Sequence, residues 1–396
     1  MADPTFLQIL WFVLIAVLWI GFFFFEGFDF GVAMLYFILG KDPRERRVMV
    51  NSIGPTWDGN EVWLLTAGGA MFAAFPGWYS TLFSGLYLPL FLVLLGLIIR
   101  GVSFEYRAMM PDDRWRDTFD WCSSIGSFIV SLVFGVGFAN FFIGMPVAGN
   151  PPHMTQSFWS LFSPLALLGG VLTVLLFTVH GAVFLTLKTE GSVYEKAEGY
   201  IKKMGPVVVV LLLAFVVCAN VFYPTSDNPW LGDIAPILTW GLGLVSVLCL
   251  VGSLLAHNKR ADTPSFIFTG VTIATLFASI FVKMYGSLGF ISEDPANPLN
   301  IVTASSSPKT LGLMSIFAAI FVPIVLGYTI WSYYVFRKRL SVANMPPEPS
   351  EDAKDEAHFS TGSEGTASHA KATSAVSGSV AGSHAARSDS SETSTS

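Results

Sequence analysis

The sequence predicts an all-α protein that crosses a lipid bilayer about nine times, and its composition is the first reason. Hydrophobic residues make up 53% of the 396 residues and charged residues only 13%, about half of the ~25% that is usual in soluble domains. A water-soluble fold could not hide so much apolar surface. The basic residues are too few to indicate a nucleic-acid partner, so the composition predicts a polytopic membrane protein.

The second reason is a set of apolar runs long enough to cross ~30 Å of hydrocarbon. The first run is unusually long and would have to tilt or project, and the second is close to the minimum length. The runs lie at residues 6–39, 60–75, 79–100, 119–143, 163–187, 205–223, 235–256, 264–288 and 310–336.

The third reason is the distribution of Lys and Arg between these runs. The loops after the first, third, fifth, seventh and ninth runs carry almost all of the basic loop residues, and the intervening loops carry only Lys309. Such alternation is typical of the positive-inside rule. It predicts an N-terminus outside the cell and a C-terminal tail in the cytoplasm, because an odd number of crossings puts the two ends on opposite sides.

Two segments lie outside the spans. Residues 42–45, Asp-Pro-Arg-Glu, have the pattern of a helix start, and the apolar residues that follow suit a short helix on the cytoplasmic membrane surface. From about Pro346 the composition changes to Ser, Ala, Gly and Thr. We therefore expect a membrane domain over residues 1–340 and a disordered tail over 346–396.

Ionisable residues inside apolar segments are the most informative positions, because each costs a few kcal/mol in the membrane. Glu26 and Asp29 stand three residues apart in the first run and share one helix face. Gly27 and Gly31 are spaced for close approach by another helix. Two desolvated carboxylates this close cannot comfortably both ionise, so at least one should bind a proton, as a proton relay requires.

Further charged groups lie at the start of the second run and the end of the third. Asp58 and Glu61 are again three residues apart, at the predicted cytoplasmic mouth, where Asp58 could cap the helix or admit protons. Arg100 ends the third run, and Glu105 and Arg107 follow it. Most of these charges suit a surface salt-bridge lattice, whereas Glu105 could be an outer proton-collecting acid.

Two other ionisable residues have simpler interpretations. His180 is the one histidine clearly within a run, and without a second membrane His or a suitable Met opposite we interpret it as a hydrogen-bonded packing residue, not a haem ligand. Lys283 is interpreted as snorkelling to the interface. No Walker A loop, GxGxxG or HExxH motif is present, which disfavours an ATP-driven pump and a metalloprotease.

Several motifs resemble subunit II of the cytochrome bd quinol oxidases, over roughly residues 6–340. They are GFDFGV at 27–32, NSIGPTWDGNEVW at 51–63, TAGGA at 66–70 and FEYR at 104–107. The resemblance implies two four-helix bundles plus one peripheral helix, in the bacterial cytoplasmic membrane. It also implies a quinol:O₂ oxidoreductase complex in the respiratory chain, which supports the proton-motive force.

The resemblance implies that this chain ligates no haem, because two haems b and one haem d belong to the partner, subunit I. It allows a bound structural quinone, lipid and small accessory membrane subunits. Subunit II would supply the heterodimer interface and part of a cytoplasmic proton-uptake route. On this basis Asp58 admits protons, Glu26 and Asp29 relay them, and Glu105 collects them. The residues expected to form the interface or support the route are Trp57, Trp63 and Arg100.

Two alternatives stay open at this point. The same acids could serve a proton-coupled secondary transporter, although no pair of broken helices marks an inverted repeat. They could also only lock helices together.

Overall fold

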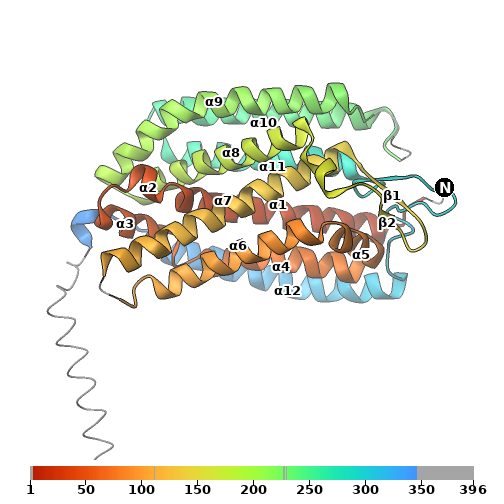
Figure 1. Ribbon diagram of the computed structural model, residues 1–396, viewed down its shortest axis with the longest axis horizontal. Coiled ribbons are helices and arrows are strands. Elements are labelled where there is room, and N and C mark those ends of the chain that lie inside the picture. The colour runs from red at the N-terminus through yellow and green to blue at the C-terminus, as the bar shows by residue number, and fades with distance from the viewer. Residues whose placement is uncertain (1–2, 111, 226–227, 229, 346–396) are drawn as a thin grey trace, which may run out of the picture.

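The computed structural model describes residues 3–110, 112–225, 228 and 230–345, which form a bundle of long helices (Figure 1). Within these residues, nine helices have 18 residues or more. They are α1 (Phe6–Met34), α4 (Trp57–Ala74), α6 (Tyr87–Tyr106), α7 (Asp113–Ile143), α8 (Pro164–Lys188), α9 (Ser192–Phe222), α10 (Ile234–Asn258), α11 (Asp262–Met284) and α12 (Pro308–Val335). The predicted tail, residues 346–396, lies outside the described residues.

Short elements cover the two ends of the bundle. At one end, on the left of Figure 1, lie α2 (Tyr36–Leu39), α3 (Pro43–Ile53) and η2 (Val342–Asn344). At the other end lies a sheet of order β2-β1-β3, in which β1 pairs antiparallel with β2 and parallel with β3. We call these the α3 end and the sheet end. The sheet end contains β1 (Met145–Ala148), β2 (His153–Met154), β3 (Phe290–Ser292), α5 (Pro76–Gly85) and η1 (Phe158–Phe162).

Eight of the nine long helices are apolar enough to span a membrane by length and composition. The exception is α4, because Asp58, Asn60 and Glu61 lie in its first turns. Its 18 residues still extend about 27 Å at 1.5 Å per residue. The N-terminus lies at the sheet end and the chain reaches η2 at the α3 end (Figure 1). An odd number of crossings is therefore needed, and α4 supplies the ninth.

Three of the predicted span boundaries were wrong. The run 6–39 is not one helix, because α1 ends at Met34 and α2 follows. The run 79–100 is divided at Leu86, between α5 and α6. Helix α9 begins at Ser192, well before residue 205, because its polar first turns continue the helix beyond the apolar stretch.

The long helices form two four-helix groups with one peripheral helix, as predicted. Helices α8, α9, α10 and α11 pack in a closed ring, α1 packs against α4 and α7, and α6 packs against α7. Helix α12 lies beside α1 and α4 (Figure 1). The two groups meet where α1 and α7 pack against α8. There the glycine prediction is confirmed, because a Cβ on Gly31 would overlap the backbone at Phe177 and one on Gly181 would lie 2.5 Å from Val32 N.

The short helix α3 begins with the predicted capping box. Asp42 accepts a hydrogen bond from the Arg44 backbone N–H at 2.7 Å, and Glu45 accepts one from the Asp42 backbone N–H at 3.3 Å. The sequence predicted that the apolar side of α3 would face lipid, but it does not. Val48 and Met49 are completely buried in a cluster shared with α1, α8 and α9, so α3 closes the end of the bundle.

Candidate functional site

Two buried carboxyl groups from α1 meet one buried guanidinium from α6. Glu26 and Asp29 share a helix face, as predicted, and neither side chain is exposed. Arg100 Nη2 lies 3.0 Å from Glu26 Oε2 and 3.8 Å from Asp29 Oδ2. Arg100 is itself completely buried. The acids predicted from their spacing therefore surround a cation, held between α1 and α6.

A third carboxyl group, that of Glu61 on α4, completes this group. Arg100 Nη1 donates a hydrogen bond to Glu61 Oε1 at 2.7 Å. The Glu61 side chain is 22% exposed, whereas those of Arg100, Glu26 and Asp29 have no exposed surface. We call these four residues the Arg100 cluster. Glu61 is therefore the member of the cluster that has exposed surface.

Aromatic rings enclose the guanidinium of Arg100. Its central carbon lies 4.9 Å from the ring centre of Phe30, 5.3 Å from that of Phe104 and 5.8 Å from that of Trp57. The Trp57 and Phe104 rings stack at 4.8 Å. Such rings favour a cation over their faces and exclude water from it. Trp57 therefore lies where a supporting residue was predicted.

A chain of hydrogen bonds leads from Asp29 to α12. Asn60 Nδ2 donates to Asp29 Oδ2 at 2.7 Å, and the hydroxyl of Tyr333 donates to Asn60 Oδ1 at 2.8 Å. The second bond fixes which way the Asn60 amide points, because a carbonyl oxygen accepts and an amide nitrogen donates. The amide is therefore oriented to present its N–H group to the carboxylate.

The charges in the Arg100 cluster do not balance. Three carboxyl groups face one guanidinium, and Arg always keeps its charge. Unpaired ionised groups are costly inside a membrane protein. In addition, Glu26 Oε1 and Asp29 Oδ1 are buried and accept no hydrogen bond from a described residue. The cluster is therefore most stable when it also holds a proton on at least one carboxyl group.

The other predicted acids lie outside this buried group. Asp58 is exposed on the first turn of α4, one turn before Glu61. It is not the helix cap, because α4 begins at Trp57 and the N-cap residue is Thr56. Glu105 is exposed on the last turn of α6. Asp58 thus adjoins the exposed side of the cluster, whereas Glu105 does not contact it.

Trp63, the other predicted support residue, fastens α4 to α1. Its ring lies 5.3 Å from that of Phe25. It also covers Gly21, where a Cβ would overlap the indole ring. Trp63 therefore fixes the spacing of the two helices that carry the three acids.

Arg100, predicted as an interface or support residue, is the buried centre of the cluster, so the surface salt-bridge lattice suggested for most charges near the end of the third run does not include it. Asn60 and Tyr333 were missed as site residues. Asn60 lies in the motif that contains Asp58 and Glu61, and its place inside an apolar stretch was the available signal. Tyr333 gave no signal, because 273 residues separate it from Asn60.

A second buried ionic group lies at the α3 end. Asp120 of α7 accepts from Arg107 Nε at 2.6 Å, from Arg107 Nη2 at 3.1 Å and from Arg46 Nε at 3.1 Å. Arg46 also pairs with Asp117 and donates to the Gly40 carbonyl at 3.2 Å. We call Arg46, Arg107, Asp117 and Asp120 the Asp120 cluster. Its two cations and two anions balance.

His180 is a packing residue, as interpreted from the sequence. Its Nδ1 lies 2.8 Å from Thr269 Oγ1 and its Nε2 lies 3.2 Å from the Phe24 carbonyl oxygen. Its ring stacks on Phe266 at 5.1 Å. With both nitrogens engaged, His180 does not fit the role of an axial haem ligand. Within the described residues, no group of three or more His, Cys, Asp and Glu could hold a metal ion.

Lys283 has a more specific role than snorkelling. Its Nζ donates to the Tyr223 carbonyl at 3.2 Å and to the Pro224 carbonyl at 2.6 Å. It therefore satisfies carbonyl groups at the end of α9, where no further turn of helix can do so.

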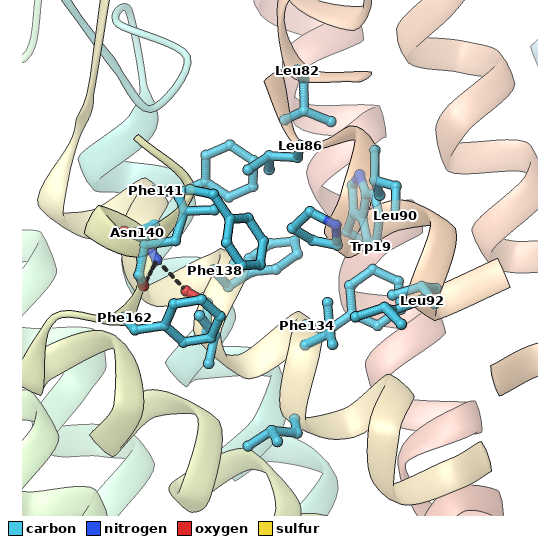
Figure 2. A pocket seen from close by; sticks show the side chains of 18 of the residues that line it. Trp19, Leu82, Leu86, Leu90, Leu92, Phe134, Phe138, Asn140, Phe141 and Phe162 are labelled. Carbon is cyan, nitrogen blue, oxygen red and sulfur yellow. Dashed lines mark hydrogen bonds between the residues drawn. The ribbon is translucent and has the colours of Figure 1, made fainter. Parts of the chain in front are cut away.

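An apolar cavity of about 340 Å³ lies towards the sheet end, between α1, α6, α7 and η1 (Figure 2). Trp19, Phe134 and Phe138 contribute aromatic walls. Asn140 turns its amide away, because Nδ2 donates to the Val136 and Leu161 carbonyls at 2.8 Å each. The cavity therefore suits a hydrocarbon chain.

Comparison with known proteins agrees with these features. The family model described as cytochrome bd terminal oxidase subunit II matches residues 7–336. The chain is 42% identical to cytochrome bd ubiquinol oxidase subunit 2 of Bacillus subtilis, over 84% of this chain and 96% of that protein. It is 34% identical to cytochrome bd-I ubiquinol oxidase subunit 2 of Escherichia coli K12, over 86% of this chain and 97% of that protein.

A solved structure shows the same fold. A chain of the bd oxidase from Geobacillus thermodenitrificans superposes with a TM-score of 0.66, over 84% of this chain and 97% of that one. The sequence identity is 17%, so this likeness concerns the fold.

Proposed function

The chain belongs to the cytochrome bd terminal oxidase subunit II family, and from this we propose that it carries protons to the site of oxygen reduction in a partner subunit. As a family member it is a multi-pass subunit of an oxidoreductase complex in the bacterial inner membrane, a respiratory terminal oxidase. Because the chain belongs to this family, we favour an oxidase subunit over the alternative of a proton-coupled secondary transporter.

The observation that supports a proton route is the charge imbalance of the Arg100 cluster. A buried group with three carboxyls and one permanent cation can hold or release a proton without losing its cation. Asp58 takes up a proton at the surface and passes it to Glu61, one turn along α4. The proton then moves to Glu26 or Asp29. Arg100 contacts both of these acids and Glu61, and so keeps the three carboxyl groups close to one another. Glu105, which is exposed and does not contact the cluster, would collect protons at the surface.

The direction of the route follows from the loop charges. The α3 end carries Lys and Arg from the loops predicted to be cytoplasmic, so we assign it to the cytoplasm. The N-terminus then lies outside and the tail inside. Asp58 opens towards the cytoplasm, as proton uptake for oxygen reduction requires.

The redox groups are proposed to reside in the partner, subunit I, which would hold two haems b and one haem d and oxidise quinol. In this chain the hydrogen bonds of His180 leave no ring nitrogen free for iron. Haem chemistry would reduce O₂ in the partner, and the residues of this chain would supply protons.

The surface of α4 suits contact with the partner. Val62, Leu65 and Phe72 are exposed on one face of the helix, and Gly69 on the same face has open space where a Cβ would point. Small residues on a membrane helix let another helix approach closely. We assign this surface to the heterodimer interface. The apolar cavity of Figure 2 would take the tail of a structural quinone.

Neutral variants of two route acids test this proposal. Asp29→Asn and Asp58→Asn should lower O₂ consumption and proton uptake at least about tenfold, because positioned acids speed proton transfer by about 10²–10⁴-fold. Asp113→Asn is the control, because Asp113 is an exposed acid of the α3 end that pairs with Arg116 on its own helix. Haem spectra of the purified complex report assembly.

The outcomes separate the proposal from the scaffold alternative. Slow turnover with normal haem content supports the route. Full turnover in both variants contradicts the route and leaves the family membership intact. Loss of assembly before any loss of turnover supports a purely structural role for the acids.

A further inference from the structure

A second cavity, of about 540 Å³, lies at the α3 end between α1, α8, α11 and the segment after α12. Eleven residues line it, of which six are aromatic, three are cationic and none is acidic. We call it the Lys188 cavity. Its lining residues are Phe24, Phe25, Phe28, Phe184, Leu187, Lys188, Thr263, Phe266, Tyr333, Arg337 and Arg339.

The backbone brings the three cations together. The segment after α12 pairs with the end of α8, because Leu340 N–H donates to the Lys188 carbonyl at 2.8 Å and Glu190 N–H donates to the Leu340 carbonyl at 2.9 Å. This pairing sets Arg337 and Arg339 beside Lys188. Asp262 pairs with Arg339 at 2.8 Å, so the rim keeps an excess of two positive charges.

The inner wall of the cavity is apolar. Phe28 stacks on Phe184 at 4.1 Å, and Phe266 packs 5.9 Å from Phe184. These rings come from α1, α8 and α11, so the wall continues along the membrane-spanning helices. The cations lie where those helices end, at the depth of lipid headgroups.

We propose that the Lys188 cavity binds an anionic phospholipid. Its phosphate would lie against Lys188 and Arg337, and an acyl chain would lie along the phenyl rings. Basic pockets between membrane helices bind such headgroups. An inorganic phosphate ion would leave the apolar wall unused, and a neutral quinone would leave the cations unused, so the combination favours a charged lipid.

Native mass spectrometry of the whole purified complex can test this site. After detergent washing, the complex is titrated with phosphatidylglycerol or with phosphatidylcholine. We expect one phosphatidylglycerol to bind tightly and phosphatidylcholine to bind at least fivefold more weakly. Lys188→Gln and Arg337→Gln should each weaken phosphatidylglycerol binding about fivefold, the equivalent of ~1 kcal/mol for each cation near a headgroup.

Lys338→Gln is the matched control, because Lys338 adjoins Arg337, is similarly exposed and does not line the cavity. It should leave binding unchanged, and Arg337→Lys should retain it. Equal loss in Lys338→Gln would show a general surface charge effect and overturn the site. Equal binding of the two lipids, or displacement of phosphatidylglycerol by inorganic phosphate, would overturn it as well.

Discussion

The two buried ionic clusters use the same residue types in opposite ways. In the Asp120 cluster two guanidinium groups face two carboxyl groups, and Asp120 accepts three hydrogen bonds. In the Arg100 cluster one guanidinium faces three carboxyl groups, two of which keep buried oxygens without a donor among the described residues. A balanced cluster can only hold the fold together, whereas an acid-rich one can also exchange protons.

The largest effect is expected where two buried cations lose the carboxylate that they share. Asp120→Asn removes the carboxylate charge that accepts two hydrogen bonds from Arg107 and one from Arg46, and Arg cannot neutralise itself by losing a proton. Breaking a buried pair in this way costs about 3–5 kcal/mol. We expect a clear fall in the thermal midpoint and in the yield of assembled complex. O₂ consumption per assembled complex should stay close to normal, and a specific loss of turnover would contradict a structural role.

Removing the cation of the other cluster should give the reverse pattern. In Arg100→Met the remaining acids can become neutral by binding protons, so the stability loss should be smaller than the ~3–5 kcal/mol expected for Asp120→Asn. O₂ consumption should fall more in Arg100→Met than in Asp120→Asn, because Glu61 is no longer held beside Glu26 and Asp29. Thermal unfolding and oxygen electrode measurements on both variants compare the clusters directly. The comparison fails if Arg100→Met is the less stable of the two.

A smaller change tests the neutral partners of the Arg100 cluster. Tyr333→Phe removes the hydroxyl that orients Asn60, which should cost about 1 kcal/mol, the usual worth of one hydrogen bond. Turnover should fall a few-fold, because the amide is then free to turn away from Asp29. Tyr334→Phe is the matched control, since Tyr334 adjoins Tyr333 and is exposed. If the two variants behave alike, the Tyr333–Asn60 contact does not matter for turnover.

The smallest effect concerns pH near the Asp120 cluster. Burial alone would raise the pKa of the Glu45 carboxyl, but hydrogen bonds from Lys196 and Ser192 hold it below its ordinary value. Its stabilising contribution is therefore complete above the unfolded pKa, near 4.5, and is lost as pH falls through the lower folded pKa. The pair with the half-buried Lys196 is worth under about 1 kcal/mol.

Thermal midpoints measured between neutral and acid pH should show this loss. Glu45→Gln should lower stability at neutral pH and remove part of the decline on acidification. A decline that is identical in the variant would assign the acid sensitivity to other groups.

The site was partly predictable, and its two halves show why. Glu26 and Asp29 could be placed on one helix face because a spacing of three residues fixes their relation within α1. Asp58 and Glu61 followed in the same way on α4. Arg100 was predicted as an interface or support residue but not as the centre of the cluster, because its position near the end of an apolar run says nothing about which side of α6 it occupies. The Asp120 cluster was not foreseen, since its members come from α3, α6 and α7.

The sequence by itself determined the membrane class, the nine crossings, the family and the presence of acids in apolar segments. Those are local properties, because the bilayer acts on hydropathy and loop charge along the chain. Only the tertiary structure decided that Arg100 lies among three carboxyls, that Tyr333 orients Asn60, and that Arg337 joins Lys188. Such contacts depend on how each helix is rotated and how deep it lies against its neighbours, and spacing within one helix does not specify either.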